Sequence, residues 1–401
     1  MELQAVIGAN YGDEGKGLVT DYLSTPSSLV VRFNGGAQAG HTVVSKVHSP
    51  PIRHVFHHIG SGSFQRADTF LSRFFVVNPL QFFDEHVVLD KMGYHNKILV
   101  DPRCSITTPI DMMINHALEE SRENRHGSCG LGINETVHRT LHDSMFGLTV
   151  GEALGGKDTG QKIRWRLERI RDEYLPLRLK ELKLKSLLPN ATKNMNDVLD
   201  WFIFKLGYFL GACEVVDFES VKTLGYEKLV FEGAQGLRLD QNSADFPHVT
   251  RSHTGLTNVL ALMRDAGLSE DQLETFFVTR TYVTKHGAGP FKYEIKGLPY
   301  PGIVDETNVP NPWQGAIRYG LLDPLNLGTR ISDHAGSLKF NVVLTCVDHV
   351  ADSRMRITNR GVESTMTIGE FDDLMWSVGS QQLFISQGPS RDSISALPVR
   401  T

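Results

Sequence analysis

The stretch Gly8-Ala9-Asn10-Tyr11-Gly12-Asp13-Glu14-Gly15-Lys16-Gly17 lies between an apolar run and an amphipathic segment. Leu3 to Gly8 predicts a buried strand, and Gly17 to Leu23 predicts the helix that follows it. Glycines in a strand-to-helix loop let backbone N–H groups approach phosphate oxygens, and the start of the helix adds its positive dipole end. Lys16 adds a point charge. The stretch therefore predicts a phosphate-binding loop.

This loop differs from a Walker A loop at two positions. Asn10 stands where the first glycine of that motif belongs, and Gly17 replaces the Ser or Thr that would bind magnesium. A magnesium ligand must therefore come from elsewhere, and Asp13 is a carboxylate inside the loop.

A second glycine-rich loop follows the next predicted strand, Ser28 to Phe33. It reads Asn34-Gly35-Gly36-Ala37-Gln38-Ala39-Gly40-His41-Thr42 and carries a histidine that can donate a proton or a hydrogen bond. One glycine-rich loop alone is a weak signal. Two such loops, one with Asp and Lys and one with His, indicate a phosphoryl-transfer site.

Short apolar runs alternate with helical patterns along the chain, which is typical of an α/β fold with a mostly parallel central sheet. Pro109 to Arg122 is predicted as a helix. Further strands are predicted at Lys228–Glu232, Phe276–Thr281, Val342–Thr345 and Gln382–Ser386. The last two run into polar loops, as ligand-bearing strands of open α/β sheets do.

The composition indicates an ordinary globular chain of 401 residues with a formal net charge of -5. This charge argues against nucleic acid and anionic membranes as partners. Neither a signal peptide nor a membrane span is expected. The four cysteines are far apart, so we expect a reducing compartment, the cytoplasm. The segment Lys162–Lys185 is rich in basic residues, and we favour a solvated amphipathic helix broken near Pro176 over a surface for polyanions.

Seven motifs in the same order along the chain resemble the adenylosuccinate synthetase family. The first loop is similar to WGDEGKG with Tyr11 for the tryptophan, and the second to GGHNAGHT. The other matches are Glu232–Gly236 with EGAQG, Pro247–Thr250 with PYVT, His286–Pro290 with VGAGP, Val343–Asp348 with LTKLD, and Ser386–Arg391 with STGPDR.

The resemblance implies a single domain over residues 1–401, with a helical excursion at about 110–225, that acts as a homodimer with Mg2+. In the implied reaction, the γ-phosphate of GTP passes to O6 of IMP, and the aspartate amine then displaces phosphate at C6. Asp13 would be the base at purine N1 and His41 the acid; Asp13 and the Gly40 carbonyl would face magnesium.

The resemblance also implies contacts with each substrate. Those with the triphosphate would be Gly12, Glu14, Gly15, Lys16, Gly17, Gly40, Thr42, Cys346, Asp348, Ser386, Gly388 and Pro389. Those with the acceptor nucleotide would be Gln38, Ser128, Cys129, Arg139, Gln235 and Thr250, with Arg139 serving the partner subunit. Those with aspartate would be Gln314, Gly315 and Arg318.

Several of these positions depart from the family pattern. The signature GIGPxYxxKxxR is reduced around Gly132–Arg139, and Ser128 and Cys129 stand where threonines are usual. The aspartate loop keeps only Arg318 of its usual arginines. Cys346 replaces a lysine in the donor base pocket, whereas Asp348 remains and favours GTP, because it can accept from guanine's N1–H and N2–H.

These departures leave alternatives open. IMP or dIMP is favoured as the acceptor because Asp13, which would crowd a 2-amino group, is present. The second hypothesis is a different enzyme on the same scaffold, which uses an altered acceptor such as (d)GMP, with GTP or ATP as donor, or an altered amine in place of aspartate. A nucleotide-binding regulator without catalysis is the third, and the presence of Asp13, Lys16 and His41 argues against it.

Overall fold

Strand β1 (Glu2–Gly8) lies inside a large sheet, between β10 and β11, with which it pairs in parallel. The computed structural model describes residues 1–47, 49–123, 125–155, 159–188, 193–305, 307–308 and 315–398. Over these ranges the sheet has ten strands in the order β19-β18-β15-β11-β1-β10-β2-β5-β7-β9. Neighbouring strands are parallel except β18 and β19. The predicted mostly parallel α/β sheet is confirmed.

The strands of this sheet, besides β1, are β2 (Ser28–Arg32), β5 (Asp68–Leu71), β7 (Ile98–Val100), β9 (Glu214–Val215), β10 (Lys228–Glu232), β11 (Leu273–Arg280), β15 (Lys339–Thr345), β18 (Leu383–Ser386) and β19 (Ile394–Ala396). Smaller sheets contain β3 (His41–Ser45) with β4 (Ile52–Phe56), β6 (Val76–Val77) with β8 (Ser105–Ile106), β12 (Val283–Lys285) and β13 (Glu294–Ile295) with β14 (Arg318–Gly320), and β16 (Arg354–Asn359) with β17 (Val362–Thr367). The helices are α1 (Lys16–Leu23), α2 (Pro79–Lys91), α3 (Pro109–Ser121), α4 (Ile133–His142), α5 (Val150–Ala153), α6 (Thr159–Arg169), α7 (Leu175–Glu181), α8 (Met195–Ala212), α9 (Thr257–Asp265), α10 (Pro324–Ala335) and α11 (Ile368–Ser377).

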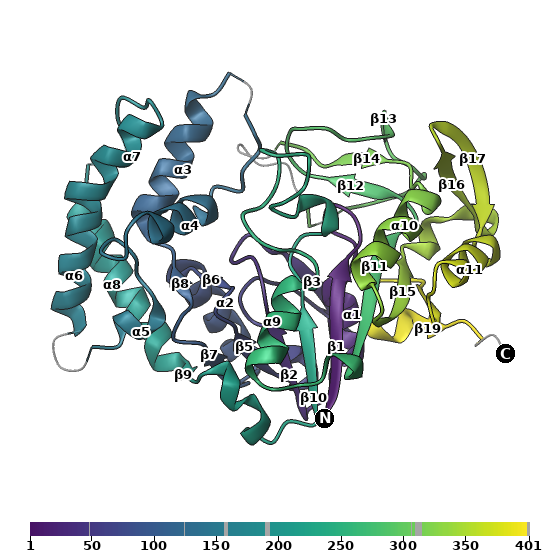
Figure 1. Cartoon of the computed structure of the whole chain (residues 1–401), viewed down its shortest axis with the longest axis horizontal. Coiled ribbons are helices and arrows are strands. Elements are labelled where there is room, and N and C mark those ends of the chain that lie inside the picture. Colours follow the sequence, from purple (N-terminus) through teal and green to yellow (C-terminus); the bar gives the residue numbers. More distant parts are fainter. Residues whose placement is uncertain are drawn as a thin grey trace.

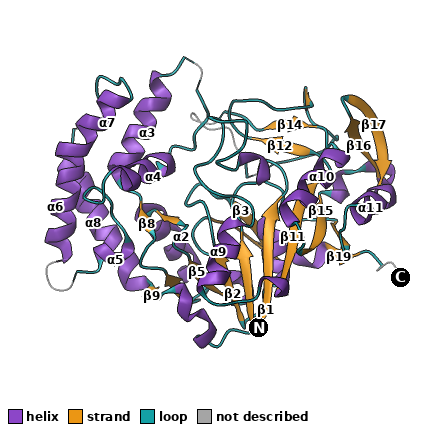
Figure 2. Cartoon of the chain, in the orientation of Figure 1, coloured by secondary structure: helices purple, strands orange, loops and turns teal. Residues whose placement is uncertain are grey.

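Helices cover both faces of the sheet (Figures 1 and 2). Alternate residues of β1 point to opposite faces. Ala5 and Ile7 belong to the core that includes residues of α9, α10 and α11, whereas Val6 packs with residues of α1. Burial on both faces explains why β1 reads as a continuous apolar run. Because β1 is held inside the sheet, the loop that follows it lies at the carboxyl edge of the sheet.

The helices α3 to α8 form a separate group beside the sheet, seen at the left of Figure 1. All of them except α4 share a second core with β7 and with residues of α2. The group runs from Pro109 to Ala212. The single domain with a helical excursion at about 110–225 stays a prediction.

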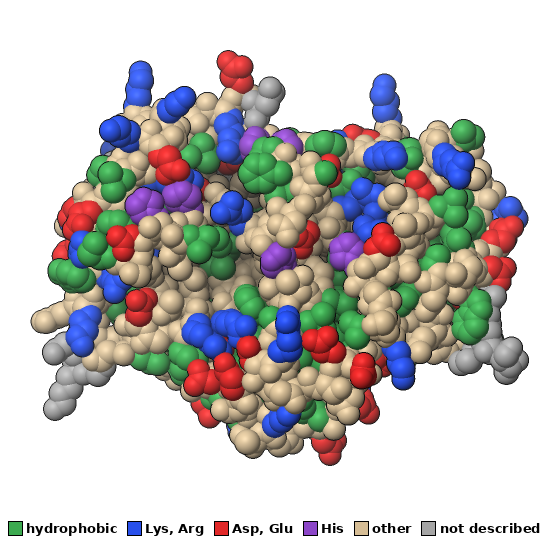
Figure 3. All heavy atoms as spheres, in the orientation of Figure 1, with side chains coloured by type: hydrophobic (Ala, Val, Ile, Leu, Met, Phe, Trp, Pro, Cys, Tyr) green, Lys and Arg blue, Asp and Glu red, His purple; other side chains and the backbone are tan. Residues whose placement is uncertain are grey.

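The basic segment within this group is helical but is not broken at Pro176. The chain runs from α6 through a π-helical segment, Ile170–Tyr174, into α7, which ends at Glu181. Pro176 has no N–H to donate to the carbonyl four residues earlier, so the irregular turn precedes it. Many of its arginines pair with carboxylates of the same group, as Arg169 does with Glu173 at 2.6 Å. Acidic and basic side chains are interspersed over this face (Figure 3), as a solvated surface requires.

No helix in the described ranges is long and apolar enough to cross a membrane.

Candidate functional site

The first loop owes its shape to three left-handed residues and one buried carboxylate. Gly12, Asp13 and Gly15 have φ angles of 111°, 60° and 97°. The Glu14 carboxylate accepts the N–H groups of Asn10 and Gly12 at 3.0 and 2.8 Å, and pairs with Lys16 Nζ at 2.7 Å. Glu14 is 2% exposed. Its side chain therefore holds the loop together, and the predicted contact of Glu14 with the triphosphate is not available to this side chain.

Gly17 allows the two glycine-rich loops to meet. A Cβ atom at this position would lie 2.8 Å from His41 Cβ and 3.0 Å from Ser61 Oγ. A Walker-type Ser or Thr would not fit without moving His41. The absence of the magnesium-binding hydroxyl is thus a consequence of how closely α1 approaches β3.

His41 is held by Glu232, at the end of β10. The distance from His41 Nδ1 to Glu232 Oε1 is 2.6 Å. Ser61 donates to the same carboxylate through its hydroxyl and its N–H, and Arg32 Nη1 lies 3.7 Å from Glu232 Oε2. Burial raises the pKa of Glu232, but Arg32 and His41 outweigh it and lower that pKa to about 2. The ionised carboxylate orients the imidazole through Nδ1, which leaves Nε2 for a ligand.

Burial lowers the pKa of His41 below its usual value, although the charge of Glu232 opposes this shift. The neutral imidazole is therefore favoured. A bound polyanion would add negative charge next to it and would raise this pKa again.

Asp13 is held in a similar way by His286, which precedes Gly287 in the fifth motif. His286 Nε2 lies 3.1 Å from Asp13 Oδ2 and 2.9 Å from Asn308 Oδ1. Asn308 donates through Nδ2 to Asp305 Oδ2 at 2.7 Å, so its oxygen faces the histidine. Burial raises the pKa of Asp13, but the hydrogen bond and charge of His286, with Arg280 and Lys16, lower it to about 2. Asp13 is therefore a carboxylate at neutral pH.

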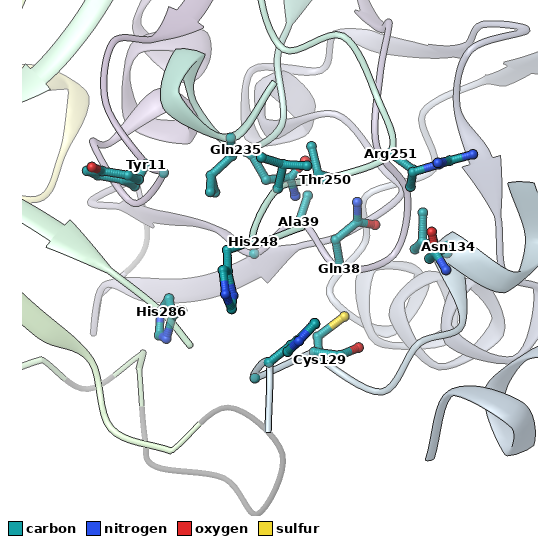
Figure 4. A pocket seen from close by; sticks show the side chains of 18 of the residues that line it. Tyr11, Gln38, Ala39, Cys129, Asn134, Gln235, His248, Thr250, Arg251 and His286 are labelled. Carbon is teal, nitrogen blue, oxygen red and sulfur yellow. The ribbon is translucent and has the colours of Figure 1, made fainter. Parts of the chain in front are cut away.

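These residues line one cavity of about 610 Å³. Segments far apart in the sequence contribute to it (Figure 4). Of the residues predicted to bind substrates or catalyse, those that line it are Gly12, Asp13, Gly15, Lys16, Gly17, Gln38, Gly40, His41, Thr42, Ser128, Cys129, Gln235 and Thr250. The two loops, the EGAQG and PYVT motifs and the Ser128–Cys129 segment thus form one site.

Several polar atoms of the cavity walls are buried without a hydrogen-bond partner among the described residues. They are Gln38 Oε1 and Nε2, Gln235 Oε1, His248 Nδ1 and His286 Nδ1. Buried polar atoms normally have partners. A polar ligand with both donors and acceptors, such as a purine nucleotide, would satisfy them.

Comparison with known proteins identifies the family of this chain. The sequence profile of the family described as adenylosuccinate synthetase matches residues 5–311. The chain belongs to the adenylosuccinate synthetase family. It is 30% identical over 314 residues to the adenylosuccinate synthetase of Thermus thermophilus, and 32% identical over 308 residues to that of Finegoldia magna. These matches cover 73% and 74% of this chain and 66% of each relative, slightly less than two thirds of its length.

Two solved structures share the fold. The fully ligated adenylosuccinate synthetase of Plasmodium falciparum has a TM-score of 0.73 at 18% identity and covers 100% of both chains. The succinoaminodeoxyadenylate synthetase of cyanophage S-2L, bound to dGMP and to dATP as an energy donor, has a TM-score of 0.62 at 15% identity. It covers 99% of this chain and 96% of the phage protein.

Arg139 does not have the position that the family pattern predicts. Its guanidinium is fully buried and pairs with Asp111 at 2.8 and 2.9 Å. It also donates to the carbonyls of Phe146 and Ile106 at 2.6 and 2.8 Å. An arginine so enclosed cannot reach a neighbouring subunit. Arg139 therefore connects α4 to α3 and to the chain around β8, and the structure does not support the predicted role in trans.

Arg318 is also occupied within the chain. It makes a bidentate pair with Glu294, with Nε–Oε1 at 2.8 Å and Nη2–Oε2 at 2.5 Å, and donates to the carbonyls of Gly287 and Gly289. Among the described residues, neither Arg318 nor Gly315 lines the cavity. Gln314 lies outside the described residues. The structure thus assigns Arg318 to β14–β13 pairing and does not support the predicted contact with aspartate.

The residues predicted to bind the donor base lie at two adjacent strand ends. Cys346 and Asp348 follow β15, and Ser386, Gly388 and Pro389 lie at or after the end of β18, which pairs with β15. The Ser386 hydroxyl donates to the Gly388 carbonyl at 2.8 Å. None of these five residues lines the cavity as described. Their contact with a nucleotide remains a prediction.

Several residues of the site were not predicted from the sequence, among them Glu232, His286, Arg280 and Arg251. Glu232 and His286 lie in recognised motifs. A charged or titratable side chain at a motif position could have identified both as candidates. Arg280 ends β11 and Arg251 directly follows the PYVT-like segment, and both line the cavity. Neither position belongs to a recognisable sequence motif, so the sequence does not mark these two arginines as site residues.

The site fits a magnesium ion that is bound mainly through phosphate and water. No group of three or more His, Cys, Asp or Glu in the described chain could hold a metal ion by itself. Mg2+ commonly uses only one or two protein oxygens together with substrate phosphates. The ionised Asp13 carboxylate and the Gly40 carbonyl, both at the cavity, would supply them.

Proposed function

We propose that this chain joins aspartate to C6 of a 6-oxopurine nucleotide with hydrolysis of a nucleoside triphosphate. The observation that carries the proposal is the convergence of Asp13, Lys16, His41 and Gln235 on one cavity. Family membership supports the same reaction. IMP or dIMP is the acceptor we favour and GTP the donor we favour, because Asp13 and Asp348 are both present.

In the first step, a phosphoryl group passes from the donor to purine O6. Asp13, ionised at neutral pH, accepts the proton of N1–H, and the electron pair moves to O6, which forms the new O–P bond. The bond between the β–γ bridging oxygen and the γ-phosphorus breaks, and His41 donates a hydrogen bond or proton to the departing diphosphate. Lys16 and the loop amides stabilise the phosphate charge, and Mg2+, when bound, neutralises the charge that shifts between phosphate oxygens.

In the second step, the amine of aspartate attacks C6 and inorganic phosphate leaves with the C–O bond electrons. This step needs a cation for at least one carboxylate of aspartate. Arg280 is better placed for this than Arg318. It lines the cavity, its guanidinium makes no hydrogen bond or ion pair with a described residue, and its charge acts on Asp13 and Asp305.

The test is release of inorganic phosphate from GTP or ATP, with IMP, dIMP, GMP or dGMP, each with and without aspartate. Aspartate-dependent release with IMP or dIMP supports the favoured reaction, and release with only GMP or dGMP supports the second acceptor class. No release with any combination would contradict the ligase and support a binding protein.

Two variants connect this activity to the residues. Asp13→Ala and His41→Asn should each lower turnover by about 10²-fold or more, because each removes a group that accepts or donates the transferred proton. Circular dichroism checks that both variants fold. Near-normal turnover in either one removes that residue from the mechanism.

We also propose a homodimer and a cytoplasmic location, by analogy with the family. Arg139 gives the dimer no support, since it is buried in its own chain. Equilibrium sedimentation across a range of protein concentrations tests the oligomeric state.

A further inference from the structure

Four arginines of the described chain line the cavity, and they fall into two classes. Arg122 pairs with Glu119. Arg178 pairs with two carboxylates, Glu135 and Glu181, each at 2.8 Å. The guanidinium groups of Arg251 and Arg280 make no hydrogen bond or ion pair with any described residue. Arg280 lies near Asp13. Away from Asp13, the unpaired guanidinium that lines the cavity is therefore that of Arg251.

Arg251 lies on the wall that faces the helical group. It follows Thr250, and in Figure 4 its side chain extends from the Thr250 segment toward the side where Asn134 lies. Gln38, Ser128 and Cys129 line the same cavity. Two of these, Ser128 and Cys129, replace family threonines, so this wall is poorer in hydroxyl donors than the family pattern.

The start of α4 provides further donors on this wall. Gly132, in the N-cap position, has φ 72° and offers no side-chain cap, and Ile133 and Asn134 of the first turn line the cavity. Uncapped N–H groups and the helix dipole attract anions at such an end. Both polar atoms of Gln38 are buried without a partner in the described chain. The wall therefore presents a cation, helix amides and an unsatisfied amide to one volume.

The nearby carboxylates do not cancel this attraction. Glu135 and Glu119 are nearly fully buried, and each is paired with an arginine, Arg178 and Arg122. Arg251 is the arginine on this side that no carboxylate of the described chain pairs with.

We propose that Arg251 and the first turn of α4 bind the 5′-phosphate of the acceptor nucleotide within the same chain, in place of an arginine from a partner. This inference rests on the proposed function, because the ligand is that function's acceptor. A guanidinium binds phosphate in a bidentate manner, which suits a terminal phosphate.

The experiment compares binding of IMP and inosine by isothermal titration calorimetry at constant ionic strength. Wild type, Arg251→Leu and Arg251→Lys are measured. Arg264→Leu is the matched control, because Arg264 is exposed and does not line the cavity. Arg251→Leu should weaken IMP binding at least tenfold and leave inosine binding unchanged. Arg251→Lys should lie between, and Arg264→Leu should match wild type.

Three results would overturn the proposal: equal weakening of IMP and inosine, unchanged IMP binding in Arg251→Leu, or a wild type that binds inosine as tightly as IMP. The outcome is separate from that of the ligase assay. A wild type that prefers IMP through Arg251 but releases no phosphate would contradict the proposed reaction and leave the phosphate site in place.

Discussion

At the scale of single residues, the surroundings decide what a titratable side chain does. Asp21 of α1 is 1% exposed, and its carboxylate accepts from Gln65 Nε2 at 3.0 Å. Burial raises the pKa of Asp21 to about 6, although the hydrogen bond from Gln65 opposes the shift. Glu232 is also buried and Asp13 is partly exposed, but the histidines and cations next to these two carboxylates lower their pKa values to about 2.

Asp21 gives a prediction for stability against pH. Its folded pKa lies above its unfolded pKa of about 3.9, so the folded state is stabilised relative to the unfolded state at low pH. That contribution is lost as pH rises from about 4 through 6. Asp21→Asn should remove this loss and raise the free energy of unfolding at pH 7 by about 1–2 kcal/mol. Urea unfolding at pH 5 and at pH 7 measures it; an unchanged value at pH 7 would contradict the assignment.

Glu232 gives a prediction for catalysis. Glu232→Gln keeps the shape of the side chain but removes the charge that orients His41 and favours its imidazolium form. Turnover in the phosphate-release assay should fall at least tenfold, because the imidazolium form of His41 is less favoured and its ring is less firmly oriented toward the ligand. Gln65→Ala is a control that removes a hydrogen bond to α1 but does not touch His41. Turnover like that of wild type would mean that Glu232 has a structural role only and does not affect the function of His41.

At the scale of elements, the distance between α1 and β3 controls the site. Gly17→Ser would place a Cβ atom 2.8 Å from His41 Cβ, so either α1 or β3 must shift. Turnover should fall at least tenfold and the melting temperature should decrease. Gly160→Ala is the matched control, since it lies in helix α6 with nothing within 4 Å of the added atom. Normal activity in Gly17→Ser would show that this contact relaxes without cost.

Arg318 tests a second element, the β13–β14 pair. Since its guanidinium is paired with Glu294, Glu294→Gln should cost about 1 kcal/mol or less, as expected for a partly exposed pair. Arg318→Leu should cost more, because it also removes the hydrogen bonds to the carbonyls of Gly287 and Gly289. The Michaelis constant for aspartate should change less than threefold. A tenfold increase in that constant for Arg318→Leu alone would restore the predicted role in aspartate binding.

At the scale of the whole molecule, Arg139 holds the helical group together. Arg139→Leu leaves Asp111 buried without its cation, and breaking a buried pair typically costs about 3–5 kcal/mol. The melting temperature should fall strongly. Mixing this variant with inactive Asp13→Ala should restore no activity beyond that of the Arg139→Leu protein alone. Restored activity in a preparation shown to exchange subunits would return Arg139 to the partner's site.

The sequence by itself determined the local units of this protein. The strand, loop and helix from Leu3 to Leu23 were predicted because burial pattern, glycines and helix start are all encoded within some twenty neighbouring residues. The sheet class followed from the alternation of such units, and the family from motifs in a fixed order. Helix α1 begins at Lys16, within one residue of the prediction.

Only the tertiary structure decided which charged groups meet. The pairing of His41 with Glu232, 191 residues apart, depends on β10 lying next to β1 and β2 in the sheet. Arg139 and Arg318 were predicted to bind ligands because they stand at motif positions. The sequence does not show which side chain an arginine pairs with in the fold. Asp111 and Glu294 occupy them, and Arg251, outside every recognised signature, was left to face the cavity. Ion pairing is a property of distance in space, and a local sequence pattern does not contain that distance.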